Sequence, residues 1–177
     1  MRLSEEEINQ RLRDDLELQE MLTLVATLEL PDWWMCAGYV RSIVWEENRY
    51  ERPDIDIVYF DPIDLSEVTE KRHEGQLRRL SDVPWSVKNQ ARMHLINGLP
   101  PYKSAKDAIS QFPETVTSIG VTKRPDFELY LPYGANDFAD RIIRPTPAFQ
   151  NDDDRYKIYR QRVIEKGWLT DPTFHVE

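Results

Sequence analysis

Apolar side chains recur at helical spacing near the start of the chain. Ser4, followed three residues later by Glu7, has the pattern of a capping box, which marks a helix start. Further along, apolar residues at i, i+3, i+4 and i+7 positions form one helix face: Leu18, Met21, Leu22, Val25 and Leu28. Pro31 then ends the pattern. We therefore expect helix over the first thirty residues.

The middle of the chain has strand patterns, and helical patterns lie around them. Segments of strand character are 55–60, 115–121 and 127–131. Helical patterns are found in 66–80, in 87–96, in a segment that Ser104 caps through Asp107, and in 152–166. The last of these begins with acids and has Lys166 near its end, which suits the helix dipole. This mixture predicts an α+β (α/β) fold, with a small mixed central sheet flanked by helices.

Length and composition are those of one globular domain. The chain has 177 residues, of which 40% are hydrophobic and 31% charged, and this excludes a disordered chain. We expect a single domain over 1–177, with 1–30 as an N-terminal helical segment, 31–145 as the core and 146–177 as a C-terminal helix and tail. Four tryptophans are expected in the interior: Trp33, Trp34, Trp45 and Trp85.

The net charge of −9 argues against two classes of partner. Long nucleic acids need a broad basic field, and anionic membranes repel an acidic surface. No apolar run approaches the roughly 20 residues of a membrane span. Cys36 lies in an apolar run and is expected to be buried. Without a recognisable signal peptide, these features predict a cytoplasmic protein with no membrane or long nucleic-acid partner.

Two aspartates open the first central strand. Residues i and i+2 of a strand share a face, so Asp54 and Asp56 project side by side while Ile55 and Ile57 point away. Neighbouring carboxylates repel each other unless one is protonated, a base lies nearby or a cation binds. Mg²⁺ fits such a pair, because it takes one or two carboxylates and completes its shell with water and phosphate oxygens. Solvated acids at a strand end are the alternative interpretation.

A second candidate segment begins sixteen residues before this strand. Gly38 has no Cβ, so a phosphate can approach the backbone there, and a helix beginning at this point directs its free N–H groups and its dipole at the phosphate. Arg41 adds a guanidinium fork that pairs with phosphate oxygens. An ordinary helix start with a surface arginine is the alternative. Together with Asp54 and Asp56, the segment predicts a triphosphate site beside a metal site.

These motifs carry a family resemblance. Ala37-Gly38-Tyr39-Val40-Arg41 and Asp54-Ile55-Asp56-Ile57-Val58 resemble the head-domain motifs of the nucleotidyltransferase superfamily, especially of the CCA-adding tRNA nucleotidyltransferases. The whole chain, over roughly residues 30 to 170, also resembles a bacterial family of nucleotidyltransferase-like proteins of unknown substrate. The elements that carry this wider resemblance include Trp33-Trp34, Val44-Trp45, Trp85 to His94, Asn97-Gly98, Pro132-Tyr133-Gly134 and Lys166-Gly167-Trp168.

The resemblance implies a nucleotidyltransferase (polymerase-beta-like) fold and transfer of a nucleoside monophosphate from an NTP. It makes Asp54 and Asp56 the catalytic residues and the ligands of Mg²⁺ or Mn²⁺. Gly38 and Arg41 then face the triphosphate. The acceptor is a hydroxyl of an unidentified small molecule, protein or RNA.

The chain departs from the superfamily pattern in two places. The usual Gly-Gly or Gly-Ser pair is Ala37-Gly38 here, which puts one close approach of phosphate to backbone in doubt. Many members also have a third carboxylate, for which Glu128 and Asp61 are both candidates. The chain is too short for the neck and body domains that hold tRNA, so CCA addition itself is not expected.

Other polar residues have both a functional and a structural interpretation. Asn89 and Arg92 either read a base or clamp a phosphate, or they belong to a polar helix that docks by hydrogen bonds; the resemblance favours the first, so we count both as cofactor-binding. His94 is expected to be a helix cap or a core residue. Thr115 and Thr117 are expected on one face of a half-exposed strand.

Three functions follow from the sequence. The first is a metal-dependent nucleotidyltransferase. The second is a catalytically silent module on the same fold that binds a nucleotide without turnover. The third is an interaction protein that uses its N-terminal helix as a partner surface.

Overall fold

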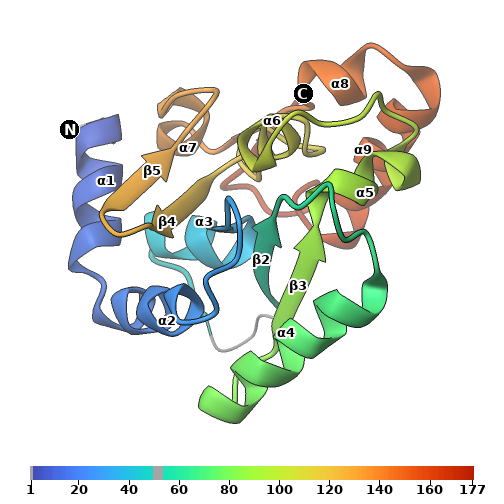
Figure 1. The fold of residues 1–177 in the computed structure, drawn as a ribbon. Coiled ribbons are helices and arrows are strands. Elements are labelled where there is room, and N and C mark those ends of the chain that lie inside the picture. Colours follow the sequence, from blue (N-terminus) through green and yellow to red (C-terminus); the bar gives the residue numbers. More distant parts are fainter. Residues whose placement is uncertain (1, 50–53) are drawn as a thin grey trace.

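A mixed sheet lies at the centre of the molecule. The computed structural model describes residues 2–49 and 54–177. The strand order of the sheet is β3-β2-β1-β4-β5 (Figure 1). These strands are β1 Trp34–Cys36, β2 Ile55–Tyr59, β3 Trp85–Asn89, β4 Gly120–Lys123 and β5 Phe127–Tyr130. A second, short sheet pairs β6 Ile142–Ile143 with β7 His175–Val176.

Helices flank this sheet on both faces, which confirms the predicted α+β fold class. They are α1 Glu5–Asp14, α2 Leu16–Ala26, α3 Gly38–Val44, α4 Glu67–Leu80, α5 Gln90–Asn97, α6 Ala105–Ser110, α7 Asn136–Ala139, α8 Pro147–Gln150 and α9 Asp153–Glu165. The predicted helices at 66–80 and 152–166 are thus found as α4 and α9. Ser104 caps α6 as predicted, because the Asp107 N–H donates to its hydroxyl over 3.0 Å.

The two faces of the sheet bury different clusters. β2 runs parallel to β3 and antiparallel to β1, in a register that sets Asp56 opposite Cys36. Ile55 and Ile57 belong to the larger core, which includes residues of α1, α2 and α3. Cys36 and Val58 belong to a smaller cluster with residues of α6. Because positions alternate along a strand, Asp56 points to the same side as Val58, which is the side of α6.

The N-terminal segment forms two helices rather than one. Ser4 and Glu7 form the predicted capping box: the Glu7 N–H donates to the Ser4 hydroxyl over 3.2 Å, and the Ser4 N–H donates to Glu7 Oε2 over 2.8 Å. The prediction of one continuous helix is wrong, because Asp15 has extended backbone angles. Its side chain accepts from the Leu18 N–H over 2.9 Å and so starts α2. α2 ends at Ala26, before the predicted stop at Pro31.

Two other segments differ from the prediction. Residues 87–89, predicted as helix, belong to β3, whose alternating burial and parallel pairing with β2 are those of a strand. Residues 115–119, predicted as strand, contain turns, and β4 starts only at Gly120. The N–H groups of Thr117 and Ser118 donate to the carbonyl of Glu114 over 3.0 and 3.1 Å, which bends the chain there.

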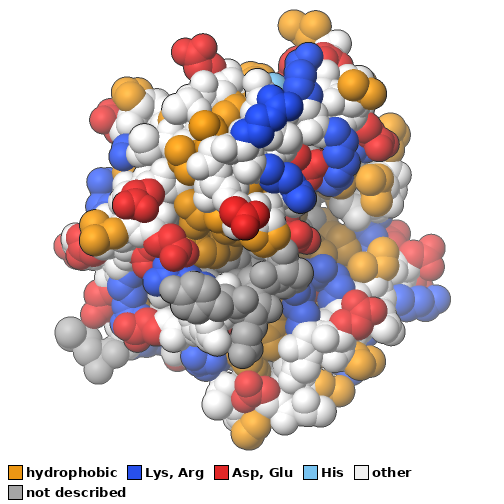
Figure 2. Space-filling model, turned by 90° about the horizontal axis from the view of Figure 1, so that it is seen from below, with side chains coloured by type: hydrophobic (Ala, Val, Ile, Leu, Met, Phe, Trp, Pro, Cys, Tyr) orange, Lys and Arg blue, Asp and Glu red, His pale blue; other side chains and the backbone are white. Residues whose placement is uncertain are grey.

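The interior holds the residues expected in it. The four tryptophans named from the sequence are buried, and so is Cys36. On the surface, acidic and basic side chains are interspersed over the face seen from below (Figure 2). No helix in the described ranges is long and apolar enough to cross a membrane.

Candidate active site

Asp54 and Asp56 line one pocket of about 200 Å³. Asp54 is exposed immediately before β2, and Asp56 is half-buried within that strand. The other residues that line the pocket are Ala37, Gly38, Arg41, Thr117, Arg162 and Lys166. Two segments singled out from the sequence therefore meet around one space, and the roles assigned to their residues stay predictions.

The two carboxylates are an unfavourable pair by themselves. Burial, and then the nearby charge of Asp54, raise the pKa of Asp56 to about 6. Three cationic side chains oppose this shift: Lys166, Arg162 and Arg41. Two carboxylates at an open pocket are a fitting donor set for a divalent cation. No cluster of three or more His, Cys, Asp or Glu side chains suited to a metal occurs within 2–49 and 54–177, so such an ion would take its other ligands from water or substrate oxygens.

The turn from β1 into α3 is strained at Ala37. Its φ of 62° and ψ of −133° are accessible to glycine and unfavourable for a residue with a Cβ. The Ala37 N–H donates to the Ile119 carbonyl over 3.2 Å, and the Ala37 carbonyl accepts from the Arg41 N–H over 3.0 Å. These bonds hold the strained conformation from both sides. α3 begins at Gly38, as predicted, and is seven residues long.

Arg41 is a buried residue rather than the surface arginine of the alternative interpretation. Only 5% of it is exposed. Its Nη1 donates to Thr117 Oγ1 over 2.8 Å. Its guanidinium carbon lies 5.0 Å from the ring centre of Trp168 and 5.6 Å from that of Trp45, within the range of cation–π attraction. The packing fixes the guanidinium at the wall of the pocket.

Two more cations reach the pocket from α9. Arg162 binds Glu114 through two hydrogen bonds, from Nε to Oε1 over 2.6 Å and from Nη2 to Oε2 over 3.1 Å. Glu114 is fully buried, and its Oε2 also accepts from the hydroxyl of Thr117 over 2.7 Å. One carboxylate therefore holds Arg162 directly and Arg41 through Thr117. Lys166 is the C-cap residue of α9 and lines the same pocket.

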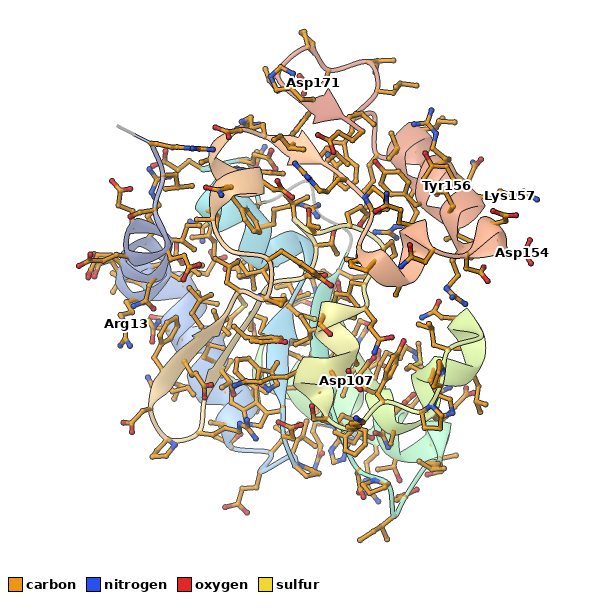
Figure 3. The ribbon with its side chains drawn as sticks, turned by 90° about the horizontal axis from the view of Figure 1, so that it is seen from above. Arg13, Asp107, Asp154, Tyr156, Lys157 and Asp171 are labelled. Carbon is orange, nitrogen blue, oxygen red and sulfur yellow. The ribbon has the colours of Figure 1, made fainter. Side chains whose placement is uncertain are left out.

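The sequence analysis did not assign Arg162, Lys166 or Glu114 to the site. A signal for the first two exists in the sequence, since Arg162 and Lys166 follow Tyr159, which is buried, at i+3 and i+7 and so share one stripe of α9 with it. Residues at other positions lie on the outer side of the molecule in Figure 3: Asp154, Tyr156 and Lys157. Thr117, expected on a half-exposed strand, is buried and lines the pocket.

Asn89 and Arg92 are engaged elsewhere. The Asn89 side chain caps α5, and its Nδ2 donates to the carbonyls of Asp61 and Asp64 over 2.8 and 2.9 Å. Arg92 binds the buried Glu70 through Nε and Nη2, over 2.9 and 2.6 Å. Neither residue lines the pocket of the two aspartates. Their contacts are those of a polar helix that docks by hydrogen bonds, and we do not carry them into the proposed site.

The third carboxylate stays unassigned. Glu128 lies on β5, exposed, with one oxygen 2.8 Å from the Lys106 ammonium. Asp61 follows β2, and its Oδ1 accepts from the Ile63 N–H over 2.9 Å. Neither residue lines the pocket. His94, which was not expected to act as a base, packs edge-on against the ring of Tyr102.

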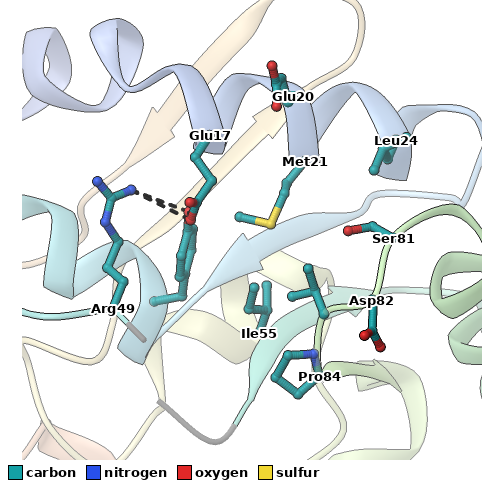
Figure 4. Close-up of a pocket in the computed structure, with 11 residues that line it drawn as sticks. Glu17, Glu20, Met21, Leu24, Arg49, Ile55, Ser81, Asp82 and Pro84 are labelled. Carbon is teal, nitrogen blue, oxygen red and sulfur yellow. Dashed lines mark hydrogen bonds and ion pairs between the residues drawn. The ribbon is translucent and has the colours of Figure 1, made fainter. Parts of the chain in front are cut away.

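A separate cavity of about 420 Å³ lies between α2 and residues 81–84 (Figure 4). Glu17 and Arg49 meet at one side of it, with an N–O distance of 3.8 Å. Of the described residues that line this cavity, Arg49 alone is cationic, and its guanidinium is bound to Asp15 over 2.8 Å. Glu20 and Asp82 add negative charge. The cavity is therefore unsuited to a triphosphate.

Comparison with known proteins identifies the family. A family model described as Nucleotidyltransferase matches residues 23–172. The chain belongs to this nucleotidyltransferase family. An NMR structure described as revealing a CCA-adding enzyme head domain is 33% identical to this chain, with a TM-score of 0.84. The alignment covers 98% of this chain and 95% of that one. The family resemblance drawn from the sequence is thereby confirmed.

Complete CCA-adding enzymes share the fold at low identity. The Thermotoga maritima enzyme in complex with tRNA is 16% identical, with a TM-score of 0.59 over 99% of this chain and 42% of its own. The Bacillus stearothermophilus enzyme in complex with CTP is 14% identical, with a TM-score of 0.56 over 92% of this chain and 41% of its own. The chain spans less than half the length of those two enzymes. A search of curated proteins found no match.

Proposed function

We propose that this nucleotidyltransferase transfers a nucleoside monophosphate from an NTP to a hydroxyl acceptor, with Mg²⁺ or Mn²⁺ held by Asp54 and Asp56. The observation that carries the proposal is the meeting of these two carboxylates with three cationic side chains around one pocket. Carboxylates favour a divalent cation, and the cations favour phosphate oxygens. The acceptor, a small molecule, protein or RNA, and a cytoplasmic location stay predictions.

The residues of the pocket divide into two roles. Asp54 and Asp56 hold the cation, which when bound neutralises phosphate charge and favours attack by a hydroxyl. Arg41, Arg162 and Lys166 bind the outer phosphates and stabilise the charge that develops on the leaving pyrophosphate. The acceptor oxygen bonds to the α-phosphorus as the bond from that phosphorus to the pyrophosphate oxygen breaks. The pyrophosphate leaves as an anion, and the proton of the acceptor hydroxyl passes to solvent water. The buried contacts of the two arginines hold them in place before the substrate binds.

A catalytically silent nucleotide-binding module is the second candidate. The strained Ala37 stands in the place of the first glycine of the superfamily's usual Gly-Gly or Gly-Ser pair, and its Cβ occupies space that a glycine leaves open to a phosphate. The described part of the chain also offers only two carboxylates to a metal at the pocket. Binding of an NTP without release of pyrophosphate is the outcome that this candidate requires.

Titration of the four NTPs separates these candidates. We would measure binding by calorimetry with and without Mn²⁺, for the wild type and for Asp54→Asn and Asp56→Asn, and then assay pyrophosphate release against a panel of hydroxyl acceptors. We expect metal-dependent binding that both variants weaken about tenfold or more, since each removes one charged ligand. Asp153→Asn, an exposed acid at the start of α9, is the matched control and leaves binding unchanged.

The outcomes are distinct. Metal-dependent binding with pyrophosphate release supports the transferase. Binding that ignores the metal and releases no pyrophosphate supports the silent module. If no NTP binds at millimolar concentration, both candidates are overturned and the interaction-protein interpretation replaces them.

A further inference from the structure

A second chamber of about 330 Å³ lies next to the aspartate pocket. Ala37, Asp56, Thr117 and Arg162 line both spaces, so the two are adjacent around these side chains. Six of the side chains that line this chamber do not line the aspartate pocket: Lys88, Gln90, Met93, Asn97, Tyr102 and Phe112. A ligand group held at Asp56 therefore has room to extend in this direction.

The sheet and α5 form the wall of this chamber. In the parallel register of β2 and β3, Val58 lies opposite Lys88, so the Lys88 side chain is on the same face of the sheet as Asp56. β3 leads directly into α5, on which Gln90, Met93 and Asn97 follow i, i+3, i+7 spacing along one stripe. The opposite side of α5 is fixed to α4 by the buried pair of Arg92 and Glu70. The wall is therefore preformed.

The side chains of the chamber match a flat, uncharged ring with a polar edge. Tyr102, Phe112 and Met93 provide aromatic and thioether surface for such a ring. Gln90 and Asn97 have amides, each of which both donates and accepts hydrogen bonds. Gln90 is 5% exposed and Tyr102 is 6% exposed, so both are held away from bulk water.

The charges of the chamber argue against a cationic acceptor as its occupant. Asp56 is the one acidic residue among the described lining residues, and it faces the cation site. Lys88 and Arg162 are both cationic. An amine-bearing acceptor needs acidic walls, because a buried cation without a partner is costly. A nucleobase needs none, since it is neutral and its edge bonds to amides.

We propose that this chamber binds the nucleobase and ribose of the donor NTP, while the aspartate pocket binds its phosphates. The inference rests on the proposed function, since it assigns the second half of the same substrate. Base selection then depends on Gln90 and Asn97, and the acceptor reaches the α-phosphate from the solvent side of Asp54.

Comparison of tripolyphosphate with NTPs tests the chamber separately from the phosphate pocket. Tripolyphosphate has the phosphates and lacks the nucleoside, so only the NTPs use the chamber. We would measure both by calorimetry with Mn²⁺, in the wild type and in Met93→Trp, whose indole fills the chamber. We expect Met93→Trp to weaken the tightest NTP about tenfold, the range for loss of a stacked base, and to leave tripolyphosphate unchanged.

Two further variants control for the added indole and test the role of the Gln90 amide. Leu95→Trp places the same indole on α5 at a side chain that is 74% exposed, and it should change neither ligand. Gln90→Met keeps the volume of the side chain and removes its amide, so it should reduce the difference in affinity among the four NTPs. Thermal melting of each variant confirms that it is folded.

The possible failures differ. If neither tripolyphosphate nor any NTP binds with Mn²⁺, the proposed function itself is overturned. If tripolyphosphate binds but no NTP binds tighter, or if Met93→Trp leaves the NTPs unaffected, the nucleobase assignment is overturned and the chamber belongs to the acceptor.

Discussion

Ala37 is one of five non-glycine residues in the described part of the chain that have a positive φ. Its positive φ is held by hydrogen bonds from both sides. We expect Ala37→Gly to raise the free energy of unfolding by about 1 kcal/mol, because relief of the strain exceeds the entropy that glycine adds to the unfolded chain. Urea denaturation measures the change. Ala91→Gly, in α5, is the control and should have the opposite sign, since a regular helical position gains nothing from glycine.

Glu114 binds Arg162 directly and Arg41 through Thr117, so its substitution tests how the two arginines of the pocket are held. Glu114→Gln leaves the Arg162 guanidinium, which is 30% exposed, without its charged partner and weakens the bond to Thr117. We expect a loss of about 3 kcal/mol in the free energy of unfolding, the low end for a broken buried pair. Tripolyphosphate affinity should fall as well. Glu128→Gln removes an exposed ion pair to Lys106 and should cost less than about 0.5 kcal/mol. Equal losses in the two variants would contradict the role given to Glu114.

Elements whose signals are local were predictable from the sequence. The capping box at Ser4, the cap at Ser104 and the acid-first helix start placed α1, α6 and α9, and the run of β-branched residues placed β2. β3 was missed because its five residues run directly into α5, and one helical pattern seemed to cover both. Segment 115–119 alternates like a strand, but the N–H groups of Thr117 and Ser118 donate to the carbonyl of Glu114, and these bonds turn the chain.

The residues of the candidate site were likewise predictable only where their signal is local. Asp54, Asp56, Gly38 and Arg41 lie in two short motifs, whereas Arg162 and Lys166 reach the pocket from α9. Spacing places these two cations on one stripe of α9, but only the tertiary packing decides that this stripe faces the pocket. Asn89 and Arg92 had residue types suited to a ligand, yet their partners come from α4 and the segment after β2. Spacing along α5 identifies which residues share a face, and the fold decides which face meets the pocket.

The break between α1 and α2 depends on Asp15. This residue caps α2 and binds Arg49 over 2.8 Å. We expect Asp15→Ala to lower the free energy of unfolding by about 1–2 kcal/mol, because both contacts are lost. Asp15→Asn keeps the cap and loses the ion pair, so it should cost about 0.5 kcal/mol. Chemical denaturation of both variants checks the order, and an Asn variant as unstable as the Ala variant would show that the ion pair dominates.

At the scale of the whole molecule, the charge of the candidate site differs from the net charge of the chain. The chain carries a net charge of −9, and its acids and bases are mixed over the face in Figure 2, yet three cations gather beside two aspartates. The cations lower the pKa of Asp56 less than burial and Asp54 raise it. The metal-free molecule is therefore less stable at neutral pH than its packing allows, and this is a property expected of a binding site.

The raised pKa of Asp56 predicts how the free energy of unfolding changes with pH, and stability measurements can test this. The pKa of Asp56 is about 6 in the folded chain, above its ordinary value of 3.8, so the folded state binds the proton more tightly than the unfolded state. The protonated Asp56 side chain therefore stabilises the folded state below about pH 4, and this stabilisation is lost as the pH rises to about 6. We expect Asp56→Asn, measured by urea denaturation in EDTA, to be more stable than the wild type at pH 7 by up to about 3 kcal/mol, and equal to it near pH 4. Asp54→Asn should show a smaller gain, because it removes the second cause of the shift and leaves the burial. If the metal-free Asp56→Asn variant is instead less stable than the wild type at pH 7, the surrounding cations stabilise the Asp56 carboxylate of the wild type. The pocket would then need no metal to balance its charge.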